Sequence, residues 1–515
     1  MKILPIGMQS LAKIRYKNAI YVDKTKLIYE LVTGGAIYFL SRPRRFGKSL
    51  VISVLKELYL GNKSLFEDLW IYDKWDWSKT SPVIHISFDE TNYDDAGLDE
   101  AISFELKEHA DKYGIELSAT HYKMQFKELL KKLNAKHGKV VLLIDEYDKP
   151  IIDYLEKEGM ETALKNQKVM KQFYSVLKNS DDLMELIFIT GVSKFSKVSL
   201  FSDLNNPSDI TLNKKYSTLC GYTQEELEFY FDAYLIQISE KLNLTREALL
   251  EHIKVWYNGY SWDGINRVYN PFGTLNFLDN EEFQNFWFAT GSPNFLIKQM
   301  KIQTIFNVEN VSVNTTQLEK YNIENITLIP LLFQTGYLTV KEKNTMTGDM
   351  ILDYPNKEVR ESMYQFLIDD LSYNPHRTHT GMTIKDLQQA LVSKNLAKAR
   401  DIINALLAAL PYEAYKNQSE GFYHGLLHLI FSYLGMFIQS EPHLSHGRAD
   451  VIVETLTDVF IFEFKFNKTA QEAITQIKNN AYADKYRILD KPITGIGVNF
   501  NEKKRKIDEW LEEIL

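Results

Sequence analysis

The chain has 515 residues, of which 45% are hydrophobic, 25% charged and 13% aromatic, and this composition excludes a disordered chain. Its formal net charge of −8 excludes a generally basic nucleic-acid coat. Cys220 is the single cysteine, so an internal disulfide and a cysteine-rich zinc site are excluded. No apolar run reaches the length of a signal peptide or a membrane span, and we expect a cytoplasmic protein without a membrane partner.

The first part of the chain alternates apolar, strand-like runs with helix-like segments. The runs lie at residues 36–40, 82–89, 139–148 and 183–191. Continuous apolar strands joined by helical crossovers are typical of a parallel sheet that is covered on both faces. Because the length allows about three domains, we assign this α/β pattern to a first domain over residues 1–215.

The pattern becomes mainly helical over residues 216–374, the second predicted domain. The segment Thr223–Glu226 is a capping box, and Asn270 followed by Pro271 forms an N-cap and N1 pair, so both mark helix starts. Residues 336–356 have the pattern of a β-hairpin with a Thr-Gly turn. Helices followed by a hairpin indicate a winged-helix-like region.

A polar break with Pro375 opens the third predicted domain, residues 375–515. Its helices and strands are expected at residues 423–434, 448–455, 459–466, 470–486 and 493–500. The basic run Asn501–Lys506 is expected to begin a solvated helix, with a contact to a DNA backbone as the alternative.

The segment Ser41–Leu50, SRPRRFGKSL, nearly fits the phosphate-loop pattern G-x-x-x-x-G-K-S/T. Gly47, Lys48 and Ser49 fit the pattern, whereas Arg42 stands at the first glycine. An apolar strand leads into the segment and an amphipathic helix follows it, so the segment lies at a helix N-terminus, which attracts anions. This context favours phosphate binding over a basic surface turn, and a triphosphate would offset the positive charge of the three arginines and the lysine. The predicted nucleotide-binding residues are Arg44, Arg45, Phe46, Gly47, Lys48 and Ser49.

Two adjacent carboxylates end the apolar run VVLLIDEYD. In a phosphate-loop protein Asp145 would complete the Mg²⁺ shell with Ser49, and Glu146 would orient and activate the attacking water. Two solvated acids that close a strand are the alternative, which the phosphate-loop pattern disfavours. The fourth apolar run ends in three polar residues expected near the γ-phosphate, Thr190, Ser193 and Lys194.

Carboxylates and a lysine also gather near the C-terminus. If strands 448–455 and 459–466 pair as a hairpin, Asp450 falls near Glu463, and the two-residue period of a strand places Glu463 and Lys465 on one face. Two carboxylates in an apolar sheet are costly unless they hold a cation, and oxygen ligands suit Mg²⁺. The predicted chemistry is metal-assisted phosphodiester hydrolysis, with Lys465 positioning the nucleophile or stabilising charge. An edge hairpin with solvent-facing charges is the alternative.

Four segments resemble, in this order, those of the AAA-ATPase-like proteins of bacteria, relatives of archaeal STAND-type ATPases. They are YVDKT, RPRRFGKS, LIDEYDKP and FITGVSKFS, which begin at Tyr21, Arg42, Leu143 and Phe188. The resemblance covers nearly the whole chain. It implies a P-loop NTPase, and it implies that an arginine-rich loop without the first glycine is the family's own form of the motif.

The helix and strand order around GRAD and FEFK resembles the PD-(D/E)XK nuclease superfamily, which the same ATPase family carries at its C-terminus. The match spans residues 417–500 and implies an αβββαβ, restriction-endonuclease-like fold; Ala449 replaces the proline of the motif. The resemblance implies metal binding by Asp450 and Glu463. It also implies that Lys465 is the catalytic lysine and that Gln476 is the helix glutamine. Glu420 would be the acid of the first helix, which binds metal. Glu420 also fits a capping box with residue 417, and this alternative stays open.

Together the two resemblances predict a protein that binds and hydrolyses ATP with Mg²⁺ and carries a Mg²⁺-dependent nuclease. The expected partner is nucleic acid. DNA is favoured, but the sequence leaves the choice between DNA and RNA open. The expected role is in defence, mobile-element control or repair. The alternative is a nucleotide-dependent switch or scaffold of the STAND type with a non-cleaving nuclease-like domain. A nucleotide-dependent homo-oligomer is a further expectation.

Overall fold

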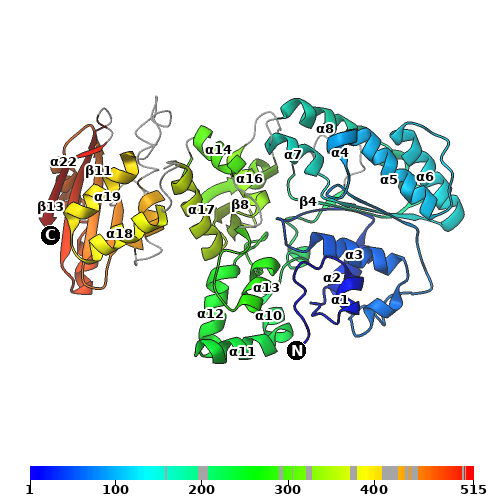
Figure 1. Cartoon of the computed structure of the whole chain (residues 1–515), viewed down its shortest axis with the longest axis horizontal. Coiled ribbons are helices and arrows are strands. Elements are labelled where there is room, and N and C mark those ends of the chain that lie inside the picture. The colour runs from blue at the N-terminus through cyan, green and yellow to red at the C-terminus, as the bar shows by residue number, and fades with distance from the viewer. Residues whose placement is uncertain are drawn as a thin grey trace. The chain divides into compact units, whose positions relative to one another are not determined.

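The structure is a computed structural model of the chain (Figure 1). It describes residues 1–156, 159–194, 207–288, 294–303, 305–319, 327–371, 380–408, 427, 429–434, 440–441, 450–501, 504 and 506–515. Two compact units are present, unit 1 with Met1–Gly291 and Glu309–Glu358, and unit 2 with Ser292–Val308 and Val359–Leu515. The chain therefore passes between the units after residues 291, 308 and 358. The domain boundaries at residues 215 and 374 stay a prediction.

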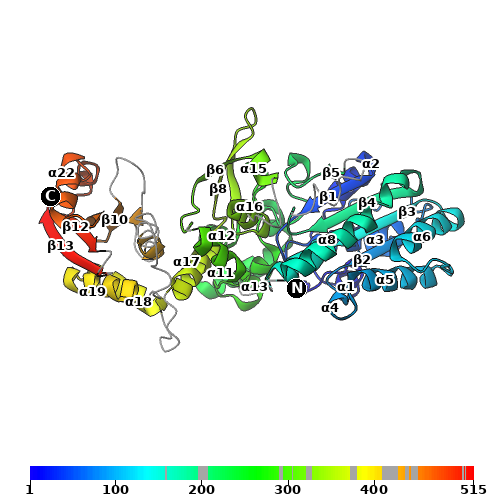
Figure 2. The same ribbon diagram turned by 90° about the horizontal axis from the view of Figure 1, so that it is seen from above.

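A five-stranded sheet forms the centre of unit 1, and all its neighbouring strands are parallel. The strands, in spatial order, are β2 (Val83–Ser87), β3 (Val140–Asp145), β4 (Met184–Gly191), β1 (Ile37–Ser41) and β5 (Ser208–Asp209). Every residue of β3 is buried, as its unbroken apolar sequence requires when helices cover both faces. The predicted parallel sheet is confirmed, and Figure 2 shows β1, β4 and β3 side by side.

Helices cover both faces of this sheet. They include α1 (Leu11–Tyr16), α2 (Thr25–Gly34), α3 (Lys48–Tyr59), α4 (Tyr93–Ala96), α5 (Leu98–Lys112), α6 (Tyr122–His137), α7 (Lys149–Glu156) and α8 (Met160–Tyr174). Figure 1 shows α1, α2 and α3 on one face and α5, α6 and α8 on the other. The apolar residues of α3 recur at helical spacing and are buried, so its packing fixes the segment that precedes it. They are Val51, Val54, Leu55 and Leu58.

The rest of unit 1 is a helical region with a small sheet. Its elements are α10 (Gln224–Tyr230), α11 (Asp232–Leu242), α12 (Arg246–Tyr257), α13 (Pro271–Asn280), β6 (Val311–Asn314), α15 (Thr315–Glu319), α16 (Leu328–Thr335), β7 (Thr339–Lys343) and β8 (Asp349–Asp353). The capping box is present, since Thr223 and Glu226 each accept the other's backbone N–H. Asn270 caps α13 with Pro271 at its start. The hairpin of β7 and β8 has the predicted place, and β6 adds a third strand.

Unit 2 holds a second five-stranded sheet that is mostly antiparallel, with β11 and β12 parallel. Its strands, in spatial order, are β13 (Lys506–Ile514), β12 (Ile493–Asn501), β11 (Val459–Phe466), β10 (Val451–Glu454) and β9 (Ser440–Glu441). Its helices include α14 (Asn294–Gln303), α18 (Thr380–Val392), α19 (Leu396–Ala408), α22 (Ala470–Asn479) and all of α17 (Lys357–Leu371) except Lys357 and Glu358, which belong to unit 1. This mixed sheet agrees with the predicted nuclease-like fold.

The sequence predicted that a helix begins in the basic run Asn501–Lys506, and this prediction is wrong. Lys506 instead opens β13, which pairs antiparallel with β12 from Thr494 to Asn501. The charged segment that follows has a local propensity for a helix. Strand β12, however, offers it backbone hydrogen-bond partners, which the local sequence does not reveal. Long-range pairing therefore decides this element.

Within the residues that the structure describes, no helix combines the length and the apolar character needed to cross a bilayer. Glu420, expected in the first helix of unit 2, lies outside the described residues.

Glu358 is a fully buried carboxyl of unit 1. Its Oε1 accepts the backbone N–H of Trp287 at 2.5 Å, whereas Oε2 has no hydrogen-bond partner among the described residues. Burial raises the pKa of Glu358 to about 8. The folded protein therefore holds this carboxyl protonated at pH values where the unfolded chain has lost the proton.

We expect Glu358→Gln to become more stable relative to the wild type as the pH rises from about 5 to about 8.5. The contribution of Glu358 is complete below its ordinary pKa of 4.5 and is lost as the pH approaches about 8. Each pKa unit corresponds to about 1.4 kcal/mol in the free energy of unfolding. Urea unfolding, followed by tryptophan fluorescence at several pH values, measures the difference. A difference independent of pH would contradict the protonated state.

Candidate functional site

Residues 41–49 connect β1 to α3 as the phosphate loop. Gly47 caps the N-terminus of α3 with φ +93°, and Arg45 has φ +67°. Apart from its two neighbours in the chain, no described residue comes within 4 Å of the place where a Cβ of residue 47 would stand, so the backbone conformation of Gly47, and not crowding, requires glycine. The first free N–H groups of α3 thus follow a left-handed turn, the geometry that receives an anion.

Arg42, which replaces the first glycine of the usual pattern, is completely buried. Its guanidinium donates to the carbonyls of Ser41 and Thr211, both at 2.9 Å, and to that of Tyr216 at 3.3 Å. The same group lies 3.8 Å from the ring centre of Trp262. Burial lowers the pKa of Arg42 to about 10. Arg42 therefore anchors the loop and does not join the charges that would meet a triphosphate.

The other residues of the loop also contact the segment that follows residue 216. Pro43 lies beside Gly336, Arg44 accepts a hydrogen bond from Trp287, Arg45 lies over Phe272, and Phe46 packs edge-to-face on Tyr260. We call Tyr260, Trp262, Phe272, Trp287 and Gly336 the loop clamp. Sequence reasoning missed it, although the aromatic residues around SWDG and NPFG were a visible signal.

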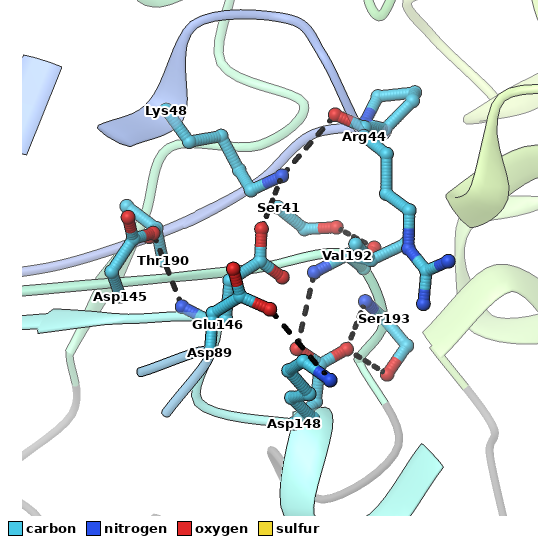
Figure 3. A network of polar contacts seen from close by, with 12 residues as sticks. Ser41, Arg44, Lys48, Asp89, Asp145, Glu146, Asp148, Thr190, Val192 and Ser193 are labelled. Atoms are coloured by element: carbon cyan, nitrogen blue, oxygen red, sulfur yellow. Dashed lines mark hydrogen bonds and ion pairs between the residues drawn. The ribbon is translucent and has the colours of Figure 1, made fainter. Parts of the chain in front are cut away.

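Two carboxylates and a lysine meet at the ends of three neighbouring strands (Figure 3). Lys48 is 3% exposed, and its Nζ lies 3.3 Å from Glu146 Oε1 and donates to the Pro43 carbonyl at 3.2 Å. Asp145 accepts the Thr190 hydroxyl at 2.5 Å because β4 runs between β3 and β1. Glu146 has a strained backbone with φ +52°. The structure thus brings together the predicted lysine, both predicted acids and one of the polar residues that follow β4.

Asp148 is the centre of a second network, which sequence reasoning missed. Its buried carboxylate accepts the backbone N–H of Ser193 and the Ser193 hydroxyl, both at 2.6 Å, and the N–H of Val192 at 3.2 Å (Figure 3). Burial and the neighbouring Glu146 raise the pKa of Asp148 to about 6. Lys194 is paired with Asp209 at 2.8 Å. Ser193 and Lys194, expected near the γ-phosphate, are thus engaged with protein groups.

A cavity of about 460 Å³ lies against the loop in unit 1. All the predicted nucleotide-binding residues from Arg44 to Ser49 line it, and Glu146 does so as well. The apolar part of its wall includes Met8, Ile20, Ile28, Cys220, Tyr222, Phe272 and Leu275. Lys24 of the YVDKT segment also lines the cavity and forms an ion pair with Glu226 at 2.6 Å. The cavity therefore joins a cationic loop wall to an apolar wall, and the carboxyl groups of Asp89, Glu146, Asp148 and Asp153 also line it.

In unit 2 the second predicted cluster comes together on β10, β11 and α22. Val451 pairs with Phe462, which brings the preceding Asp450 beside Glu463. Asp450 accepts the Phe464 N–H at 2.8 Å. Lys465 Nζ donates to Glu463 Oε1 at 3.1 Å and to Gln476 Oε1 at 2.6 Å. Four of the five predicted residues are thus gathered, and the fifth, Glu420, lies outside the described residues.

Glu463 is the most buried carboxylate of this cluster, with 1% of its surface exposed. Burial, and then the charge of Asp450, raise its pKa to about 7, although Lys465 opposes the shift. Its Oε2 is buried without a hydrogen-bond partner in the described part of the chain. An unpartnered carboxylate oxygen beside a second carboxylate fits a divalent cation with oxygen ligands. The described residues supply no third His, Cys, Asp or Glu to such a site.

Fold and sites together define an ATPase-like unit joined to a nuclease-like unit. Two family models match the chain: "Predicted AAA-ATPase" over residues 5–201 and "PD-(D/E)XK nuclease superfamily" over residues 418–510. An "uncharacterized protein in vnfD 5'region" of Azotobacter chroococcum mcd 1 is 37% identical over 527 residues, covering 100% of this chain and 99% of the relative. No solved structure matches. The chain belongs to the AAA-ATPase-like family with a C-terminal PD-(D/E)XK domain, as the resemblance had implied.

We expect Arg42→Met to lower the stability of unit 1. Methionine has a similar length but donates no hydrogen bond, and each buried carbonyl left unpaired costs about 1–3 kcal/mol. Thermal unfolding of the two proteins measures the loss. Arg44→Met is the matched control, because Arg44 is exposed and its removal leaves these carbonyls paired. Equal unfolding temperatures for Arg42→Met and the wild type would contradict the anchoring role.

Proposed function

We propose that unit 1 binds and hydrolyses ATP and that unit 2 cuts nucleic acid, DNA rather than RNA, in a metal-dependent reaction. The observation that carries the proposal is the meeting of Lys48, Asp145 and Glu146 at one end of the parallel sheet, beside the cavity. In open α/β sheets, ligands bind outside the carboxyl ends of the strands. The protein would act in the cytoplasm, in defence, mobile-element control or repair, as a nucleotide-dependent homo-oligomer.

The cavity supports a nucleotide more strongly than a bare phosphate. Its loop wall offers positive side chains and helix N–H groups to the phosphates, and its apolar wall offers a surface for a base. Its volume of about 460 Å³ lies within the usual range of small-molecule sites. Both walls belong to unit 1.

The Lys48–Glu146 pair indicates how hydrolysis would begin. A bound phosphate would compete with Glu146 for the Lys48 ammonium and release the Glu146 carboxylate toward the water that attacks. Thr190 would keep Asp145 in place during this exchange. Ser49 and Asp145 would hold Mg²⁺, since a hydroxyl and a carboxylate suit this ion, and the ion would neutralise phosphate charge.

Lys48→Ala should abolish ATP binding, whereas Glu146→Gln should bind ATP at least as tightly as the wild type and hydrolyse it slowly. The first change removes the phosphate contact; the second removes the base and the competing negative charge. Isothermal titration and phosphate release measure the two properties. Lys56→Ala, on the same helix, is the control for loss of a lysine. Equal affinity in the wild type and Lys48→Ala would overturn the assignment of the loop.

In unit 2, Asp450 and Glu463 would hold a divalent cation, together with Glu420. The ion would polarise the phosphodiester and supply an activated water. Lys465 would orient the nucleophile or stabilise developing charge, and Gln476 would fix the position of the Lys465 ammonium.

Glu463→Gln should lose Mn²⁺ binding, measured by isothermal titration, and Mg²⁺-dependent cleavage of plasmid and single-stranded DNA. Lys465→Met should still bind Mn²⁺ but cleave more slowly by about two to three orders of magnitude, the usual effect of removing one charge-stabilising group. Glu454→Gln is the control, since Glu454 lies on the adjacent strand and pairs with Lys491 at 2.6 Å. Cleavage that survives Asp450→Ala and Glu463→Ala together would refute the site.

One observation favours the alternative of a nucleotide-dependent switch or scaffold. The described residues contribute only two carboxylates to the cluster of unit 2, and the Lys465 ammonium is already bonded to Glu463 and Gln476. Such a cluster could bind nucleic acid without cutting it. Retained DNA binding without cleavage at any Mg²⁺ or Mn²⁺ concentration would favour this function.

A further inference from the structure

Glu358 connects two places where the chain leaves unit 1. The chain passes to unit 2 after Gly291 and again after Glu358. The Glu358 carboxyl accepts the backbone N–H of Trp287 at 2.5 Å and also that of Phe288. The segment that precedes the first crossing is thus held to the residue that precedes the last one. These contacts lie within unit 1.

Trp287 also contacts the phosphate loop. Its indole Nε1–H donates to the Arg44 carbonyl at 3.1 Å. Tyr260 and Tyr337 pack on its ring, with centroids 6.3 and 5.4 Å away. The backbone N–H of Trp287 is bonded to Glu358, and its ring packs against Tyr260 and Tyr337. These contacts leave the indole little freedom to move. The Arg44 carbonyl is therefore bonded to the Trp287 side chain, whose position Glu358, Tyr260 and Tyr337 fix in turn.

We propose that Trp287 is a positioning residue for the phosphate loop, that Glu358 keeps Trp287 in place, and that nucleotide binding is thereby linked to the two chain crossings. The proposal rests on nucleotide binding at the loop. In a trans peptide the C=O and N–H point in opposite directions, and the described part of the chain has no cis peptide. Fixing the Arg44 carbonyl on Trp287 thus directs the Arg45 N–H away from the indole.

Arg45 belongs to the cavity wall and has a left-handed backbone. The neighbouring Pro43 carbonyl accepts Lys48. A rotation of the peptide between Arg44 and Arg45 would therefore disturb both the turn and the place of the Lys48 ammonium. The Trp287 hydrogen bond opposes that rotation, so its loss should weaken nucleotide binding more than it weakens folding.

Linkage makes the effect reciprocal. If the Trp287 contact favours the loop conformation that binds nucleotide, bound nucleotide must favour the Trp287 contact by the same factor. The Trp287 and Phe288 amides donate to Glu358 and report this directly. Their hydrogen exchange should slow when a non-hydrolysable ATP analogue binds, a change that a purely structural role of Trp287 would not produce.

The test compares four full-length variants with the wild type for affinity toward the ATP analogue, unfolding temperature and exchange of the Trp287 and Phe288 amides. Trp287→Phe keeps a ring but loses the indole N–H. Trp256→Phe makes the same change at a ring that stacks on Phe283 and is the matched control. Glu358→Gln keeps an acceptor for the two amides, whereas Glu358→Ala does not.

We expect Trp287→Phe and Glu358→Ala to bind the analogue about three- to tenfold more weakly, the effect of one hydrogen bond, and to lose the nucleotide-induced slowing of exchange. Glu358→Gln and Trp256→Phe should match the wild type in both respects at neutral pH. Wild-type affinity in a stably folded Trp287→Phe would overturn the inference while leaving ATP binding intact. Failure of the wild type itself to bind the analogue would overturn both.

Discussion

A buried guanidinium sets the shape of the nucleotide site. Arg42 lies in the protein interior, where its guanidinium donates hydrogen bonds to three carbonyl groups and lies over the face of Trp262. Desolvation of a charge is expensive, so the guanidinium depends on these three carbonyl groups and on the Trp262 ring. One of the carbonyls belongs to Ser41, the first residue of the loop, and the other two, those of Thr211 and Tyr216, lie beyond β5. The loop can therefore take its working shape only when these segments have come together.

The same dependence extends to the other residues of the loop. In the usual phosphate loop, glycines permit a tight turn that the following helix supports. Here a proline, two exposed arginines and a buried phenylalanine occupy that turn, and the loop clamp supplies the support from outside it. The site is thus built by two stretches of unit 1, one that carries the phosphate-binding groups and one that carries the aromatic rings. Neither stretch forms the site alone.

Local sequence signals predicted the parts of the site that depend on neighbours in the chain. Gly47 and Lys48 follow an apolar strand, and the alternation of Glu463 and Lys465 is a property of a single strand. Non-local contacts were beyond such signals. Two of the three carbonyl partners of Arg42 lie about 170 residues away along the chain, and nothing in the spacing of Trp262 or Trp287 indicates which loop they touch.

Strand β13 was missed for a similar reason, because its partner β12 decides its conformation. Asp148 was visible as an acid after β3, but its function in holding Ser193 depends on the approach of β4. In both cases the sequence shows the residue types, but it does not show which strand lies beside them in the fold. The fold class could be predicted because periodicity and segment order are themselves local properties.

The interrupted path of the chain constrains how this protein can be divided or recombined. Unit 1 is completed only by residues 309–358, and residues 292–308 belong to unit 2. A single cut therefore cannot release both units intact: a fragment that ends at residue 291 keeps Trp287 but lacks Gly336, and a fragment that ends at residue 358 holds all of unit 1 but also takes residues 292–308 from unit 2. Replacing only the C-terminal region with that of another protein would separate residues 292–308 from the rest of their unit.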